Sequence, residues 1–111
     1  METISWADFE KLEIRVGTIM EAEDFVGARK KSYKLLIDFG TYGIKKSSAQ
    51  ITHHYKTADL LGRQVAAVVN FPPKQIANFF SECLVLGIYD VSGEVVLLQP
   101  DRKVLNGLKI G

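Results

Sequence analysis

The residues that could bind a polar ligand are concentrated in one short stretch, residues 70–82, which lies between two apolar runs. This stretch offers amide, ammonium, hydroxyl and aromatic side chains, from Asn70, Phe71, Lys74, Asn78, Phe79, Phe80 and Ser81. Proteins use such groups to neutralise anions, to hydrogen-bond to polar ligands and to stack on flat rings. The stretch predicts non-covalent recognition. The alternative is an ordinary connection in which Phe71, Ile76 and Phe79 fold back under a sheet.

Two strands are predicted to hold this stretch in place. Val65–Val69 is a short apolar run rich in β-branched residues, which is typical of a strand buried on both faces. Pro72 and Pro73 lack an N–H group and end that strand. A second apolar run, Cys83–Leu86, is predicted to form the next strand and to stop at Gly87.

Three more strands are predicted nearer the N-terminus. Residues 12–20 alternate apolar and polar, which places Arg15 on the face opposite the core, and Gly17 indicates a bend. Residues 33–39 form the second strand, and glycines at both ends of the turn 40–43 predict a hairpin. The third strand, 44–51, carries Lys45, Lys46, Ser47, Ser48 and Gln50. A strand this polar should face solvent or a ligand.

Two helices and an apolar tail complete the predicted elements. Ser5 is a suitable N-cap for a helix over 5–11, whose apolar face could close its own barrel or pack on a second subunit. A second helix is predicted over 52–61, with Thr52 as its N-cap and Gly62 as its stop. The last residues, 101–111, are too apolar for a disordered tail and should dock on the barrel or across a dimer interface.

Composition narrows the class of protein. The 111 residues suit one domain, 1–111, and the net charge of +1 hides a basic middle: residues 25–80 carry nine basic and two acidic side chains. That imbalance suggests a face aimed at an anion, with a solvated lysine-rich surface as the alternative. The single Cys83 excludes an internal disulfide and should be a buried thiol. No run is long enough to span a membrane and no signal peptide is evident, so we expect a cytoplasmic protein without membrane insertion.

Catalysis and cofactors are not expected. His53 and His54 are adjacent and would diverge on a helix, and no further Cys or His could complete a metal site. The glycines are scattered, so there is no phosphate-binding glycine loop, and no convincing nucleophile–base spacing is present. We therefore expect no enzyme, no metal and no cofactor.

The chain resembles the tRNA-binding OB-fold domain, and within that family the CsaA group of small export chaperones. The resemblance covers nearly the whole chain. It lies in residues 70–87, with an Asn, two prolines, a basic residue and Ser-Glu before an apolar strand, supported by residues 12–19, 35–40, 46–52, 95–100 and 109–111. It implies an all-β fold, a five-stranded Greek-key barrel with an N-terminal helix and a C-terminal extension. The strand order alone would also allow an SH3-like barrel.

The resemblance also implies non-catalytic binding of tRNA or another structured RNA. Its binding surface matches Arg15, Lys46, Ser48, Gln50, Asn70, Lys74 and Ser81 of this chain. We expect Arg15, Lys46 and Lys74 to contact phosphates, and Ser48, Asn70 and Ser81 to fix position. Phe79 or Phe80 could stack on a base.

Three departures from the family pattern favour a second hypothesis. Asn78 replaces a usual Gly and is expected to adopt the left-handed conformation, Phe80 replaces a basic or polar residue, and Lys74 replaces Arg. The last two changes weaken an RNA contact and add apolar surface. The alternative function, implied by the CsaA resemblance, is an export chaperone that binds unfolded preprotein segments through Phe71, Phe79 and Phe80 and meets the export machinery. A homodimer is expected in either case, with the N-terminal helix and residues 95–110 at the contact.

Overall fold

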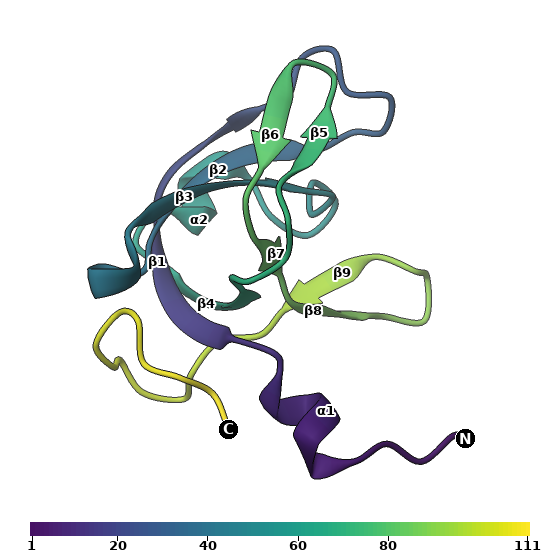
Figure 1. Ribbon diagram of the computed structural model, residues 1–111. Helices are drawn as coiled ribbons and strands as arrows, with labels where there is room; N and C mark the ends of the chain where they lie inside the picture. Colours follow the sequence, from purple (N-terminus) through teal and green to yellow (C-terminus); the bar gives the residue numbers. More distant parts are fainter.

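The computed structural model describes all 111 residues and contains a five-stranded antiparallel sheet that curls into a nearly closed barrel (Figure 1). The strand order is β3-β2-β1-β4-β7. The bounds are β1 Ile14–Asp24, β2 Tyr33–Asp38, β3 Ile44–Ala49, β4 Gln64–Val68 and β7 Leu84–Val85. This is the predicted OB-fold, with the short helix α2, Thr57–Leu60, between β3 and β4.

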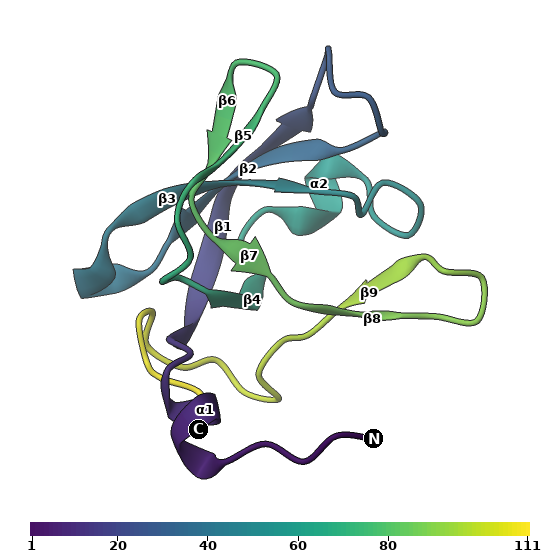
Figure 2. The same cartoon turned by 45° about the vertical axis from the view of Figure 1, so that its right-hand side comes forward.

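Two small hairpins project from the barrel. One pairs β5, Lys74–Ile76, with β6, Phe79–Ser81, and the other pairs β8, Gly87–Tyr89, with β9, Val95–Leu97. Figure 2 shows them leaving the barrel in different directions on either side of β7. Helix α1, Trp6–Glu10, lies beneath the barrel, and a single 3-10 turn, η1, Gly40–Tyr42, joins β2 to β3.

The core is built from the alternation in β1 and β2 and from the fully buried β4. The twelve buried residues of the main cluster include Ile19, Leu35, Ile37, Phe39 and Val65. Gly17 allows β1 to pass over β2, because a Cβ at that position would lie 2.7 Å from the side chains of both Ile37 and Phe39. The predicted bend at Gly17 thus has a packing reason.

The Ser-Glu pair before β7 closes the barrel against β3. The Ser48 N–H donates to the Ser81 hydroxyl oxygen over 3.1 Å, and the Lys46 N–H donates to the Glu82 carboxylate over 2.8 Å. In return, the Glu82 N–H donates to the Lys46 carbonyl over 2.8 Å. These bonds satisfy the outer edge of β3, which would otherwise present unpaired backbone groups.

The C-terminal segment docks on its own barrel. Its backbone pairs with the first half of β1: Gly107 N–H donates to Val16 O, Val16 N–H to Leu108 O, and Ile110 N–H to Ile14 O. The Gln64 side chain both donates to and accepts from the backbone of Val104. Of the two predicted docking places, the structure therefore shows the barrel.

The predicted helix over 52–61 is wrong in its first half. Residues 52–54 form a turn, and α2 begins only at Thr57. Tyr55 accounts for the break, because its carbonyl accepts a hydrogen bond from the Tyr33 hydroxyl over 2.7 Å and its own hydroxyl accepts from Leu97 N–H over 2.9 Å. Both bonds hold Tyr55 to the barrel, and this tertiary anchoring outweighs local helix propensity.

The left-handed residue of the β5–β6 turn is also not the predicted one. Ala77 has a φ of 54°, whereas Asn78 is not among the residues with positive φ. The register pairs Ile76 with Phe79, so Ala77 and Asn78 are the two turn residues. A two-residue hairpin turn needs positive φ at its first central position, and that position falls on Ala77.

None of the helices is long and apolar enough to cross a membrane.

Candidate functional site

A groove of about 1040 Å³ lies between the end of β3, the β5–β6 hairpin and the turn of the β8–β9 hairpin. Five of the residues predicted from the sequence line it together: Ser48, Gln50, Phe71, Lys74 and Ser81. Ser48 and Gln50 come from β3 and the residue just after it, and Phe71 and Lys74 come from the proline-containing connection. The structure thus brings together two stretches that are separated by about twenty residues in the chain.

Three lysines give the groove its positive character. Lys30 and Lys31 reach it from the loop between β1 and β2, and Lys74 reaches it from β5. All three are exposed, and none forms an ion pair within the protein. The basic run at 29–31, which could have been only solvated surface, therefore supplies two ammonium groups to the same groove as Lys74.

Ser48 and Gln50 leave polar side chains free at the groove. Neither side chain has a hydrogen-bond partner within the protein, although the Ser48 backbone N–H is used. The Ser81 hydroxyl is different, because it accepts from Ser48 N–H and donates to the Cys83 carbonyl over 3.3 Å. Ser81 positions β3 at the groove, while Ser48 and Gln50 keep full capacity to bind a ligand.

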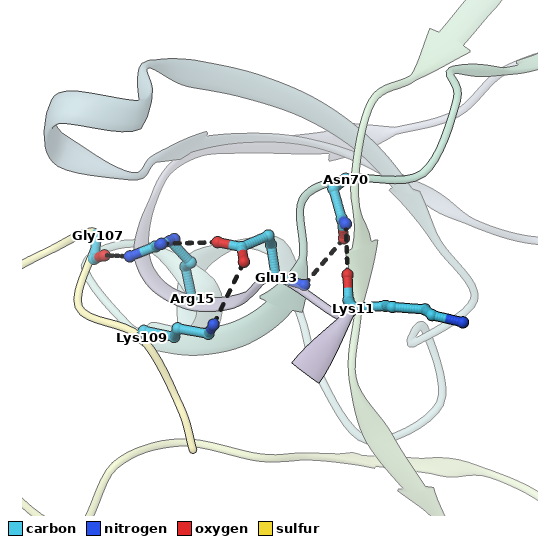
Figure 3. Close-up of polar contacts among 6 residues, drawn as sticks. All are labelled: Lys11, Glu13, Arg15, Asn70, Gly107 and Lys109. Atoms are coloured by element: carbon cyan, nitrogen blue, oxygen red, sulfur yellow. Dashed lines mark hydrogen bonds and ion pairs between the residues drawn. The ribbon is translucent and has the colours of Figure 1, made fainter. Parts of the chain in front are cut away.

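Asn70 is not part of the groove lining; it joins two segments of the backbone (Figure 3). Its Oδ1 accepts from Glu13 N–H over 2.9 Å, and its Nδ2 donates to the Lys11 carbonyl over 2.8 Å. Both ends of the amide are therefore used to attach the end of α1 to the end of β4. Asn70 therefore has a structural role here, and its predicted contact with RNA stays a prediction.

Arg15 is also away from the groove, in a network with the C-terminal segment (Figure 3). Its guanidinium donates to the Gly107 carbonyl over 2.9 Å and to Glu13 over 2.7 Å, and it lies 3.9 Å from the centre of the Tyr42 ring. Only 13% of the side chain is exposed. Arg15 and Lys109 together hold the pKa of Glu13 below its ordinary value, chiefly through the hydrogen bond from Arg15.

Lys46 and Phe79 lie outside the groove, in a separate small pocket that also contains Asn78. The Phe79 ring is buried and stacks on Phe25 with their centroids 5.3 Å apart. Of the three residues that the alternative interpretation expected to fold back under the sheet, only Phe79 is buried, because Phe71 and Ile76 line the groove. Phe80 is 46% exposed but lines neither hollow.

The sequence analysis did not predict that the β8–β9 hairpin forms one side of the groove. Tyr89, Gly93 and Glu94 line the groove from this side, and His53 faces them from the turn after β3. The ring of His54 lies 2.7 Å from the Asp90 carboxylate, which fixes the hairpin to that turn and lowers the pKa of Asp90. These residues are 36 positions apart, so no local pattern indicates the contact.

No three His, Cys, Asp or Glu side chains gather into a group that could hold a metal ion. Cys83 is buried among apolar neighbours, and burial raises the pKa of its thiol to about 11.

Comparison with known proteins gives a family for this arrangement. Residues 14–109 match the family described as "Putative tRNA binding domain". The methionine–tRNA ligase of Methanocaldococcus jannaschii is 34% identical over 110 residues, covering 99% of this chain and 17% of the ligase. That of Pyrococcus horikoshii is 36% identical over 111 residues, covering 99% of this chain and 15% of the ligase. The chain thus spans less than a fifth of the length of these relatives.

Solved structures extend the likeness to whole chains. The chaperone CsaA from Bacillus anthracis str. Ames superposes with a TM-score of 0.95 at 51% identity, covering 99% of this chain and 100% of that one. The CsaA chaperone protein from Picrophilus torridus superposes with a TM-score of 0.92 at 54% identity, covering 98% of this chain and 100% of that one. A MetRS related protein from Pyrococcus horikoshii superposes with a TM-score of 0.89 at 25% identity, and the match covers both chains completely. The family match over residues 14–109, together with the barrel fold, shows that the chain belongs to the tRNA-binding domain family, and it is similar over its whole length to CsaA chaperones.

Proposed function

We propose that the protein binds tRNA in the groove between β3 and the β5–β6 hairpin. The observation that carries this proposal is the convergence of Lys30, Lys31 and Lys74, all exposed and free of ion pairs, on one groove. Unpaired ammonium groups attract phosphates and release condensed counterions on binding. Membership of the tRNA-binding domain family supports RNA as the polyanion.

The groups in the groove divide into two roles. The three lysines neutralise phosphates and set the position of the RNA backbone, without reading sequence. Ser48 and Gln50 hydrogen-bond to riboses or base edges, because their side chains have no partner in the protein. Phe71, 49% exposed at the groove, offers a face on which an unpaired base stacks.

The proposed activity is binding without catalysis, in the cytoplasm. The only cysteine is buried with a raised thiol pKa, which disfavours the nucleophilic thiolate. The one His–carboxylate pair, His54 with Asp90, joins two surface segments. Neither arrangement offers an activated nucleophile.

Fluorescence anisotropy with labelled tRNA at low and physiological salt tests the RNA proposal. We expect affinity to fall steeply with salt, and Lys74→Glu to lower affinity at least tenfold at low salt, because a phosphate contact becomes a repulsion. Lys103→Glu, on an exposed residue outside the groove, is the matched control and should lose much less affinity. Absence of tRNA binding at either salt, or equal losses in the two variants, contradicts the proposal.

A second candidate function is binding of unfolded preprotein segments, by analogy with the CsaA chaperones. The observation in its favour is the apolar surface in the same groove: Phe71 and Leu84 are each 49% exposed and Tyr89 is 79% exposed. Apolar side chains of an extended peptide would be accommodated there. Salt separates the two functions, because peptide binding through apolar contacts persists at ionic strengths that release RNA.

A homodimer is the proposed assembly. Large apolar side chains remain exposed at one end of the molecule, where α1, the β8–β9 hairpin and the C-terminal segment lie in both views (Figures 1 and 2). Trp6 is 84% exposed, Ile88 56% and Leu105 77%. Several large apolar side chains left exposed at one end of a small domain favour an interaction site there.

Point variants test the dimer better than truncation, because residues 107–110 are hydrogen-bonded to β1 and their removal would leave the backbone groups of Ile14 and Val16 unpaired. Sedimentation equilibrium should show a dimer for the wild type and a monomer for Trp6→Glu. Val26→Glu introduces a charge at an equally exposed position in the loop after β1 and should remain dimeric. A monomeric wild type contradicts the proposal.

A further inference from the structure

A second pocket, of about 320 Å³, shares the β5–β6 hairpin with the groove, and four of its eight lining residues are charged. Its walls come from β1, β2, β3 and the turn of the β5–β6 hairpin, and its polar lining residues are Glu21, Glu23, Lys34, Lys46 and Asn78. The volume is at the lower end of the roughly 300–1,000 Å³ typical of small-molecule sites. It suits one small planar group better than a length of polymer.

The two lysines converge on one aromatic ring. The Lys34 ammonium lies 5.4 Å and the Lys46 ammonium 5.5 Å from the centre of the Phe79 ring, and Lys34 also lies 4.8 Å from the centre of Phe25. All three distances are within the range of cation–π attraction. Two like charges beside one ring repel each other, so this arrangement favours a ligand that accepts hydrogen bonds from both.

The carboxylates of the pocket are unused. Glu23 is the direct cross-strand partner of Lys34, yet no ion pair within 4 Å forms between them. Glu21 and Glu23 are both exposed and accept no hydrogen bond from the protein. The pocket therefore presents ammonium donors and carboxylate acceptors side by side, with the Asn78 amide able to act as either.

This combination selects the chemical class of the ligand. A phosphate would be attracted by the two lysines but repelled by the two carboxylates. Guanine is uncharged and has acceptors at O6 and N7 with donors at N1–H and the N2 amino group. Lysine pairs with O6 or N7, and a carboxylate pairs with the N1–H and N2 donors; adenine, cytosine and uracil each lack one of these donor or acceptor pairs.

We propose that this pocket binds one unpaired guanine of the RNA. The proposal rests on the proposed RNA-binding function of the groove. The two sites share the β5–β6 hairpin: Lys74, Ile76 and Ser81 face the groove, and Asn78 and Phe79 face the pocket. A strand that crosses the hairpin from the groove places a single base in the pocket.

Anisotropy with labelled heptanucleotides tests the base preference. One RNA is heptauridine, and in each of the others the central uracil is replaced by guanine, adenine, cytosine or hypoxanthine. We expect wild-type protein to bind the guanine strand about tenfold more tightly than the adenine strand, as one good paired contact provides. The hypoxanthine strand, which lacks only the N2 amino group, should lie between them.

Variants assign the preference to the pocket. Glu21→Ala/Glu23→Ala should bind guanine and adenine strands equally, while affinity for heptauridine does not fall, because negative charge is removed. Glu2→Ala/Glu10→Ala carries the same change of charge outside the pocket and should keep the preference. Lys74→Glu should weaken all strands in proportion and leave their ratio unchanged.

The outcomes separate the two proposals. Salt-dependent binding of tRNA with equal affinity for all heptanucleotides overturns the guanine pocket and leaves the groove function standing. A guanine preference that survives Glu21→Ala/Glu23→Ala also overturns the pocket. Absence of binding to tRNA and to every strand overturns both.

Discussion

The guanidinium of Arg15 donates a hydrogen bond to the carbonyl of Gly107 over 2.9 Å and so joins β1 to a segment 92 residues away (Figure 3). The bond lies beside the backbone pairing of Val16 with residues 107 and 108. Arg15 therefore helps the C-terminal segment to cover the first half of β1. This position explains a basic residue on the outer face of the strand without requiring an RNA contact.

Arg15→Ala should destabilise the protein by about 2 kcal/mol, because it removes charge-assisted hydrogen bonds to Gly107 and Glu13 and the stacking on Tyr42. Urea denaturation measures the change. Lys103→Ala, an exposed residue without an ion pair, should stay within about 0.5 kcal/mol of wild type. Unchanged stability together with a large loss of tRNA affinity would return Arg15 to the RNA site.

The Glu13 carboxylate should make the stability of the protein depend on pH below about 4.5. Hydrogen bonds from Arg15 and Lys109 lower its pKa from the ordinary 4.5, so its stabilisation is complete above 4.5 and is lost as the pH falls through the folded-state pKa. Urea midpoints measured between pH 7 and pH 3 should fall less steeply for Glu13→Gln than for wild type. Some dependence should remain, because the pKa values of Asp8 and Asp90 are also lowered.

Gly17→Ala should destabilise the barrel by about 2–3 kcal/mol, since the new methyl group would lie 2.7 Å from Ile37 and Phe39 in a closely packed core. Gly111→Ala has open space around the added methyl and serves as the control. Thermal denaturation of both variants compares them directly. Equal melting temperatures would mean that β2 can move away from β1 at little cost.

Ala77→Gly should stabilise the protein by about 0.5–1 kcal/mol. A left-handed φ of 54° costs an alanine about 1–2 kcal/mol, and glycine avoids that cost but loses some chain entropy on folding. Ala28→Gly, in a loop at ordinary φ, should be neutral or slightly destabilising. Equilibrium unfolding in urea measures the stability of both variants. A destabilised Ala77→Gly variant would show that the turn conformation is not strained.

Strand patterns predicted the individual strands, whereas the choice of an OB-fold over an SH3-like barrel came from the family resemblance. The buried run at 65–69, the alternation in 12–20 and the polar third strand correspond to β4, β1 and β3, and these patterns follow from burial of one or both strand faces. The prediction of a helix over 52–61 was wrong around Tyr55, which is hydrogen-bonded to Tyr33 and Leu97. Those partners are distant in sequence, so local propensity could not indicate them.

For the candidate site, the sequence by itself determined which residue types are available: a basic middle segment, a proline-containing connection and the Ser-Glu pair before β7. Only the tertiary structure decided how they are used. It uses the Asn70 and Arg15 side chains in hydrogen bonds to other parts of the protein, and it buries Phe79 against Phe25. It gathers Lys30, Lys31 and Lys74 along one groove. The physical reason is that an alternating pattern specifies which face a side chain occupies, whereas its partners depend on how the sheet curls and which segments close it.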